Sequence, residues 1–363
     1  MFNFIPLEYY SIVFYNFLLL IVVAMYFQSQ GSSIDSETNI KNKRGLGIFV
    51  LCFVILYMGL RPVSGKYFGD MGRYAMMFNE YAAGAELVLV KDILFEIFLY
   101  ASSAIMNVSF FFVFCAFLYC YPVYRISVKF FGSYWFYAFL IQVAGFSFWG
   151  GGANGIRNGL AAACFLWGLS QSNQKIRLGL LIGSTFIHGS LLLPTAAYLL
   201  TMFYKNTKMF LLFWLLCIPV SLAFGGFFEG FFFSLGFGAE ERLAGYLTEL
   251  DEGIANSRTG FRWDFLIYSA SGVFSGWYFI VKRKFDDPVY TQLFNVFLLC
   301  NAFWVLVIRA NFSNRFAYLS WFILGLVIIY PLLKFKFFNK QHLLIGRIIF
   351  VYFMVSYVLT ILV

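Results

Sequence analysis

Long apolar runs, separated by short polar segments, dominate this chain. The runs approach the ~20 residues that an α-helix needs to cross the hydrocarbon core of a bilayer. A membrane β-barrel would instead alternate apolar and polar residues over strands of ~10, and that pattern is absent. The sequence therefore predicts an all-α polytopic membrane protein. The ten predicted spans are 9–28, 45–60, 107–124, 131–149, 158–172, 209–228, 263–281, 289–308, 316–333 and 345–363.

Two further apolar stretches are less regular. The first, 93–105, is short and carries Glu96, and the second, 178–203, has His188, Gly189 and Pro194 in its interior. Each could be a plain span, which gives twelve in all. Each could instead be a re-entrant hairpin or a broken helix that makes no net crossing. We therefore expect about 10–12 transmembrane helices, with re-entrant segments as the alternative to two more spans.

Basic residues predict the orientation, because Lys and Arg accumulate in cytoplasmic loops. The basic clusters lie at 41–44, 125–129, 175–177, 205–208, 282–284 and 334–340. All of them can face the cytoplasm only if neither irregular stretch crosses the membrane. Irregular backbone at membrane depth is tolerated only inside protein or beside a water-filled cavity. We expect both termini outside and one transmembrane domain over 1–363, with outer loops 61–92, 150–157, 229–262 and 309–315.

Composition sharpens this interpretation. The chain is 61% hydrophobic and 12% charged, whereas soluble domains are about a quarter charged. We interpret the net charge of +9 as an orientation signal and expect no binding to nucleic acid. The first run lacks a basic start and a small-residue cleavage site, which predicts a retained helix. All six Cys lie in apolar runs and only two His are present, so we expect no metal and no cofactor.

The type of base differs between the two predicted sides. The outer loops hold eight Arg and two Lys, and the rest of the chain holds five Arg and eleven Lys. Arg in outer loops opposes the orientation rule, so it needs another reason. Its planar fork grips carboxylate or phosphate with two hydrogen bonds, which Lys cannot do. Outer acids are also plentiful, and individual Arg side chains could pair with them. The sequence favours an outward cavity whose Arg side chains hold phosphate groups.

Four short motifs carry most of the candidate chemistry. The run Gly150–Gly152 would let the backbone approach a ligand closely, and Arg157 follows it at a predicted helix start, where free N–H groups favour anions. His188 lies at predicted membrane depth, where an ionisable group is costly and suggests function. The four motifs are Gly59-Leu60-Arg61 with Gly69-Asp70 and Tyr74, Gly150 to Arg157 with Leu160-Ala161, Ile187-His188-Gly189-Ser190, and Arg309 with Arg315 and Tyr318.

At these motifs the chain resembles the EpsG-like branch of the Wzy polysaccharide polymerases. The family pattern is G-x-R followed by G-x-D and Tyr, then Asn-x-x-Arg-x-x-Leu-Ala, Phe-His-x-Ser and a late Arg-x-x-Tyr. The chain departs from it with Ile187 before His188 and with a longer insert between Arg61 and Asp70. The resemblance covers about 45–330. The matching residues are Arg61, Asp70, Tyr74, Asn154, Arg157, Leu160, Ala161, His188, Ser190, Arg315 and Tyr318.

The resemblance implies a glycosyltransferase of GT-C-like architecture in the bacterial inner membrane. Such an enzyme polymerises undecaprenyl-diphosphate-linked oligosaccharide units at the outer face, with membrane lipid and a chain-length regulator as further partners. An O-antigen ligase, a flippase of lipid-linked sugars and a membrane acyltransferase stay as alternatives. The expected catalytic residues are Arg157, His188, Arg315 and Asp70. The expected substrate-binding residues are Arg61, Tyr74, Asn154, Arg242, Tyr246, Arg309 and Tyr318.

Overall fold

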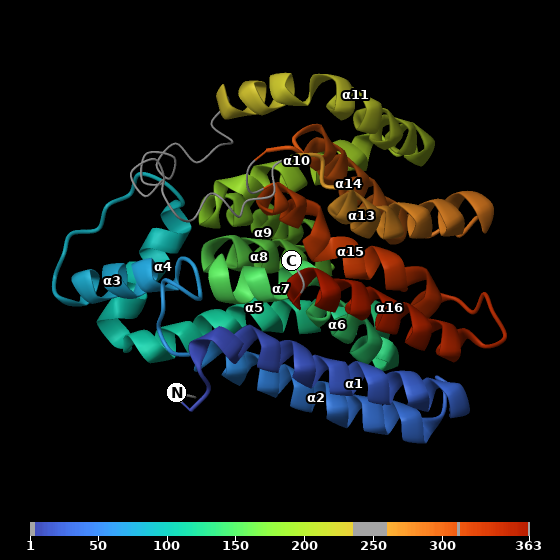
Figure 1. The fold of residues 1–363 in the computed structure, drawn as a ribbon, viewed down its shortest axis with the longest axis horizontal. Helices are drawn as coiled ribbons and strands as arrows, with labels where there is room; N and C mark the ends of the chain where they lie inside the picture. Colours follow the sequence, from blue (N-terminus) through green and yellow to red (C-terminus); the bar gives the residue numbers. More distant parts are fainter. Residues whose placement is uncertain (1–3, 235–259, 311–312, 362–363) are drawn as a thin grey trace. The chain divides into compact units, whose positions relative to one another are not determined.

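The computed structural model describes residues 4–234, 260–310 and 313–361. Within these ranges every regular element is helical (Figure 1), which confirms the predicted all-α polytopic membrane protein. The longer helices are α1 (Tyr10–Gly31), α2 (Glu37–Gly59), α5 (Val108–Phe131), α11 (Thr207–Ser234), α14 (Pro288–Leu306), α15 (Asn314–Lys334) and α16 (Gln341–Ile361). The shorter ones are α3 (Met71–Ala82), α4 (Ile93–Ile105), α6 (Trp135–Val143), α7 (Phe146–Trp149), α8 (Ile156–Ser170), α9 (Gln174–Ile187), α10 (Leu192–Phe203) and α13 (Trp263–Gly276).

Among the described residues, 7 helices are long and apolar enough to cross a membrane. They coincide with seven of the ten predicted spans. The predicted spans 131–149, 158–172 and 263–281 fall on shorter or interrupted helices. The first is divided because Gly145 takes an extended conformation between α6 and α7. The last continues from α13 into a π-helical turn, Trp277–Lys282.

The helices group into two compact units. Unit 1 contains Met1–Thr195 and Ile329–Val363, and unit 2 contains Ala196–Ile328. Each unit is described below by itself. The prediction of one transmembrane domain over 1–363 stays a prediction.

Close helix contacts in unit 1 depend on small residues. A Cβ added to Gly59 of α2 would lie 2.6 Å from the Cα of Val113 in α5. A Cβ on Gly346 of α16 would lie 2.2 Å from the Oγ of Ser29 in α1. Small residues let membrane helices approach until their backbones touch, so these two positions set the spacing of the α2–α5 and α1–α16 pairs.

The irregular stretch 178–203 folds as a helical hairpin. The chain leaves the helical conformation at His188, with φ −153° and ψ 122°. Across this break the Oγ1 of Thr195 donates a hydrogen bond to the Leu181 carbonyl at 3.0 Å. These residues would be about 21 Å apart along one continuous helix, so the chain turns back on itself after His188. The predicted break at the centre of this stretch is confirmed.

The other irregular stretch forms α4, which also folds back on its neighbour. This helix has only 13 residues, fewer than a span requires. The ring centroids of Phe98 and Phe111 are 5.4 Å apart, and those of Phe98 and Phe114 are 5.9 Å apart. The short helix α4 thus packs against the first turns of α5.

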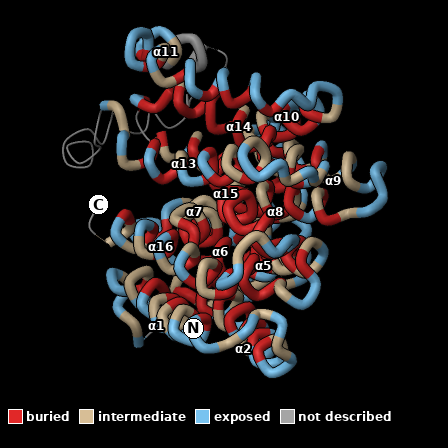
Figure 2. The backbone as a smooth tube through the Cα atoms, turned by 90° about the vertical axis from the view of Figure 1, so that its right-hand side faces the viewer, coloured by how far each residue is buried: buried red, intermediate tan, exposed pale blue. Residues whose placement is uncertain are grey.

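Buried polar bonds hold the helices of unit 2 together. The indole of Trp214 in α11 donates to the Oδ1 of Asn301 at 2.7 Å, and the Nδ2 of Asn301 donates to the Oγ of Ser320 at 2.9 Å. These three side chains join α11, α14 and α15. Of the 18 residues that form the most apolar stretch of α15, 83% are buried. Figure 2 shows this helix mostly in the colour of buried residues. Polar groups in such surroundings are stable only when hydrogen-bonded, and here each satisfies another.

Candidate active site

Arg157 lies in the first turn of α8 and forms an ion pair with Asp92. The Arg157 Nη1 is 2.9 Å from the Asp92 Oδ2, and the two side chains are 17% and 2% exposed. Asp92 takes a left-handed conformation, φ 52°, directly before α4. An aspartate tolerates this conformation better than most residues do. The predicted position of Arg157 at a helix start is confirmed, and its partner is an acid 65 positions earlier in the chain.

The second oxygen of Asp92 reaches the hairpin of α9 and α10. The backbone N–H of Gly189 donates to the Asp92 Oδ1 at 2.9 Å. One buried carboxylate therefore holds both the start of α8 and the turn of the hairpin. Asp92 is the last residue of the predicted outer loop 61–92, and nothing in the local sequence distinguishes it from the other acids of that loop.

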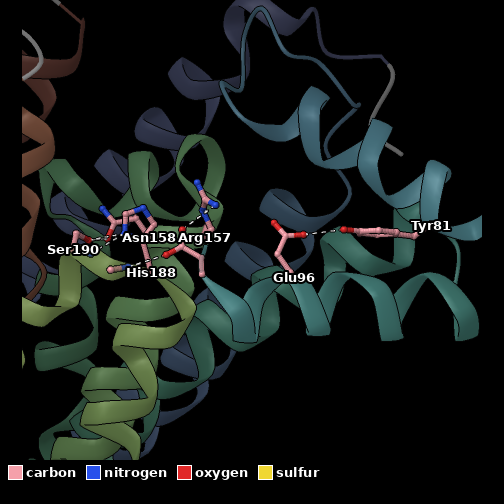
Figure 3. Close-up of polar contacts among 8 residues, drawn as sticks. Tyr81, Glu96, Arg157, Asn158, His188 and Ser190 are labelled. Carbon is pink, nitrogen blue, oxygen red and sulfur yellow. Dashed lines mark hydrogen bonds and ion pairs between the residues drawn. The ribbon is translucent and has the colours of Figure 1, made fainter. Parts of the chain in front are cut away.

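His188, Ser190 and Asn158 form a second polar group beside Arg157 (Figure 3). The Nδ1 of His188 lies 2.8 Å from the Ser190 Oγ and accepts the Ser190 backbone N–H at 3.2 Å. The Ser190 hydroxyl donates to the Asn158 Oδ1 at 3.2 Å. Because Nδ1 acts as an acceptor, the neutral imidazole carries its hydrogen on Nε2. His188 thus enters the site as a hydrogen-bond donor at Nε2.

The loop before α3 meets the loop before α8. The Asp70 N–H donates to the Asn154 carbonyl at 3.2 Å, and a Cβ on Gly69 would lie 3.3 Å from the Asn154 Cβ. The side chain of Asn154 is exposed, and that of Asp70 is partly exposed. Asn154 lies three positions before Arg157, and Asp70 is hydrogen-bonded to Asn154. The structure therefore joins the loop of Asp70 to the loop of Asn154 and Arg157, two motifs that the sequence left separate.

Tyr74 and Arg61 lie deeper in the protein. Tyr74 is 2% exposed, and its ring lies 5.0 Å from that of Phe95, which the Arg157 guanidinium faces at 6.0 Å. Arg61 is 1% exposed and donates to the backbone carbonyls of Met58 and Ala153. In this structure Arg61 stabilises the loop that precedes α8. The predicted contacts of Tyr74 and Arg61 with substrate stay predictions.

A second buried acid, Glu96, lies one turn beyond Asp92 on α4. Its Oε2 accepts the hydroxyl of Tyr81 at 3.2 Å (Figure 3). Burial and the charge of Glu96 raise the pKa of Tyr81, so the phenol stays protonated and donates to the carboxylate. This bond holds α3 against α4.

The glycine run before Arg157 serves packing. Gly150–Asn154 forms a π-helical turn, and a Cβ on Gly152 would lie 2.4 Å from the Met58 Cε. The sequence suggested that these glycines allow a ligand to approach. The structure places protein against Gly152 instead, and the turn delivers Arg157 to the start of α8.

Replacing Gly159 with alanine should destabilise the protein by about 1–3 kcal/mol. A Cβ at this position would lie 2.0 Å from the Gly151 carbonyl oxygen, so the glycine turn and α8 must separate. Gly183→Ala in α9 is the matched control, because its Cβ meets nothing within 4 Å and alanine favours a helix. Unfolding midpoints of the purified variants in detergent test this. A midpoint for Gly159→Ala at or above the control's contradicts the packing role.

Three predicted residues lie in unit 2. Arg309 is exposed and donates to the Leu222 carbonyl at 3.3 Å. Arg315 is exposed in the first turn of α15, and Tyr318 follows one turn later with its ring 5.8 Å from that of Trp321. Arg315 and Tyr318 are thus on neighbouring turns of one helix, as their spacing predicted. The remaining two predictions, Arg242 and Tyr246, lie outside the described residues.

Among the residues that the structure describes, no group of three or more His, Cys, Asp or Glu side chains could hold a metal ion. The polar side chains gathered in the unit 1 site are those of Arg157, Asp92, His188, Ser190 and Asn158, and Asp70 and Asn154 lie on the adjoining loops. Ser190 was part of a predicted motif. Asp92 and Asn158 were not predicted as site residues.

One known protein family matches most of the chain. Residues 44–363 match the model of the EpsG family. Searches of curated proteins and of solved structures each give no match. The family match includes Arg157, Asp92 and His188 together with every other residue of the candidate site. The chain therefore belongs to the EpsG family.

Proposed function

We propose that this protein polymerises oligosaccharide units carried on undecaprenyl diphosphate, by glycosyl transfer at the outer face of the bacterial inner membrane. Membership of the EpsG family suggests a polymerase of polysaccharides. The observation that carries the proposal is the setting of Arg157. Its guanidinium is held by Asp92 through Nη1, while its buried Nε has no hydrogen-bond partner among the described residues.

Arg157 suits a phosphate ligand because the ion pair uses only part of its fork. A guanidinium carries five N–H donors in fixed directions. Asp92 orients the group, and the remaining donors stay available to a diphosphate oxygen. A preorganised donor in a site that excludes water stabilises developing negative charge strongly. The start of α8 adds backbone N–H groups that favour the same charge.

In the proposed reaction, a hydroxyl oxygen of the acceptor sugar attacks the anomeric carbon of the growing chain. A new carbon–oxygen bond forms, and the bond from that carbon to the diphosphate oxygen breaks. The lipid diphosphate leaves with the electron pair, and Arg157 binds the charge. The hydroxyl proton passes to a base. The products are a chain longer by one repeat unit and a free lipid diphosphate.

The hydrogen bonds of His188 bear on which residue is the base. Two of the expected catalytic residues, His188 and Asp70, have side chains that could accept a proton. Since the His188 Nδ1 accepts from Ser190, its Nε2 carries a hydrogen and can donate to the leaving diphosphate. Asp70 is a carboxylate beside Asn154 and has acceptor oxygens only. We assign Asp70 as the base and His188 as a donor.

A polymerase must also hold a second lipid diphosphate, that of the acceptor. We assign this role to Arg309 and Arg315 of unit 2, with Tyr318 of the same unit binding sugar hydroxyls. The exposed guanidinium of Arg315 suits a ligand that arrives from the membrane surface. A chain-length regulator would be a further partner of this enzyme.

Replacing Arg315 with alanine should lower polymer formation by about 10–100-fold, because one charged hydrogen-bonding group to the acceptor is lost. Arg315→Lys keeps the charge but not the fork and should recover only part of the activity. Polymer length on gels, at matched protein levels in membranes, measures both. Full activity of Arg315→Ala would remove this residue from the proposed acceptor site.

Reconstituted protein tests the function directly. The purified chain in vesicles should convert undecaprenyl-diphosphate-linked repeat units into a ladder of products, without another acceptor. An O-antigen ligase would form product only when a lipid A core acceptor is added. A flippase would move the lipid-linked sugar across the vesicle membrane and form no new glycosidic bond. Either of these two results would replace the proposal.

A further inference from the structure

Unit 1 contains a cavity at the end opposite Arg157. Its volume is about 430 Å³. The turn between α1 and α2 and the turn between α15 and α16 line it together with Tyr134, and Figure 1 shows both turns at the same end of unit 1. The 23 residues of α2 extend from this end to Arg61, a distance of about 34 Å. The cavity is therefore separate from the proposed active site.

Three lysines line this cavity with little to neutralise them. Lys334, Lys336 and Lys340 all contribute to the wall and are exposed. No ion pair involves any of them among the described residues. Asp35 is the one carboxylate of the lining, and its Oδ1 accepts the hydroxyl of Tyr134. The cavity thus carries a net positive charge.

The loop that carries these lysines is held in place by Gln341. Its Oε1 accepts the backbone N–H of Phe337 at 2.7 Å, and its Nε2 donates to the Phe335 carbonyl at 2.8 Å. The same nitrogen donates to the Leu332 carbonyl. A buried side chain therefore fixes both arms of the turn. A positive site that is already ordered costs less entropy when an anion binds.

The rest of the lining is partly hydroxyl-bearing and partly apolar. Ser32 and Ser33 offer hydroxyl groups, and Ile34, Leu333 and Phe335 offer apolar surface. Phe335 is 58% exposed beside the lysines. A free inorganic anion would gain no binding energy from the apolar part of the wall. A phospholipid can contact both parts of the wall. Its phosphate would bind the polar side, and the adjoining glycerol and first methylene groups would contact the apolar side.

We propose that this cavity binds the phosphate headgroup of an anionic phospholipid. Basic pockets between membrane helices bind such headgroups. A basic segment that only orients the chain needs neither a cavity nor a fixed loop. The site does not depend on the polymerase function, since it lies at the other end of α2.

Thermal unfolding of the full-length protein in detergent tests the site. Phosphatidylglycerol should raise the unfolding midpoint more than phosphatidylcholine does. The triple variant K334Q/K336Q/K340Q should lose this difference, with apparent affinity for phosphatidylglycerol reduced tenfold or more, since each lysine near an anionic headgroup contributes about fivefold. The control K205Q/K208Q/K282Q removes three exposed lysines from other basic segments and should keep the difference.

A second variant separates the cavity from the charge. Ser33→Trp fills the cavity with an indole and leaves all three lysines, and it should also abolish the preference for phosphatidylglycerol. Equal stabilisation of the lysine variant and the wild type overturns the proposal, as does full binding by Ser33→Trp. Inorganic phosphate at equal ionic strength should have little effect. If phosphate alone reproduces the stabilisation, the ligand is the free ion and the assignment to a lipid is wrong.

Discussion

Replacing Arg157 with alanine should lower polymer formation by about 10²–10³-fold, the loss seen when one preorganised donor to a developing charge is removed. The side chain is 17% exposed and fixed by Asp92, so water cannot fully replace it. Arg157→Lys retains the charge but lacks the fork, and should recover little activity. Product ladders from reconstituted protein give the rates.

The matched control is Arg73→Ala. Arg73 lies on α3 in the same unit, is exposed, and has no ion pair among the described residues. It should keep wild-type activity. If Arg157→Ala reacts as fast as Arg73→Ala, Arg157 has no catalytic role, and the proposed function loses the observation that carries it.

Removing Asp92 should destabilise the protein by about 3–5 kcal/mol, which is the cost of leaving a buried charge without its partner. Asp92→Ala removes the carboxylate that lies 2.9 Å from the Arg157 guanidinium. It also leaves the Gly189 N–H at the hairpin turn without its acceptor. Asp92→Asn can still accept one hydrogen bond, and should cost less. Unfolding midpoints in detergent, followed by tryptophan fluorescence, measure the change.

A double-mutant cycle separates this ion pair from general damage to the fold. Arg157→Met removes the charge and keeps a long apolar side chain. The double variant D92A/R157M should be more stable than Asp92→Ala alone, since no buried charge is left without a partner. Strictly additive effects would show that Asp92 stabilises the site through Gly189 and not through Arg157.

The long helices could be predicted from the sequence because their signal is composition over about 20 residues. Runs such as 289–308 and 316–333 coincide with α14 and α15. The run 131–149 looked equally apolar, yet it divides at Gly145 and continues as a π-helical turn. Hydropathy cannot detect such a break, because it is averaged over about 20 residues and one glycine barely changes the mean.

The candidate site was predictable where its chemistry is local. Arg157 follows a glycine run at a helix start, and His188 lies before a glycine at the turn of a hairpin, so both carry signals in adjacent residues. Asp92 carries none. Its role comes from contacts with Arg157 and Gly189, which lie 65 and 97 positions further along the chain. Only tertiary packing brings these together. The burial of Arg61 was hidden for the same reason.

The hairpin of α9 and α10 has a consequence for how the protein enters the membrane during synthesis. Neither helix, with 14 and 12 residues, is long enough to be recognised by the insertion machinery as a stop-transfer segment. The hydroxyl of Thr195 meets its acceptor, the Leu181 carbonyl, only when both halves are present. We therefore expect residues 174–203 to leave the translocation channel together, as one hairpin.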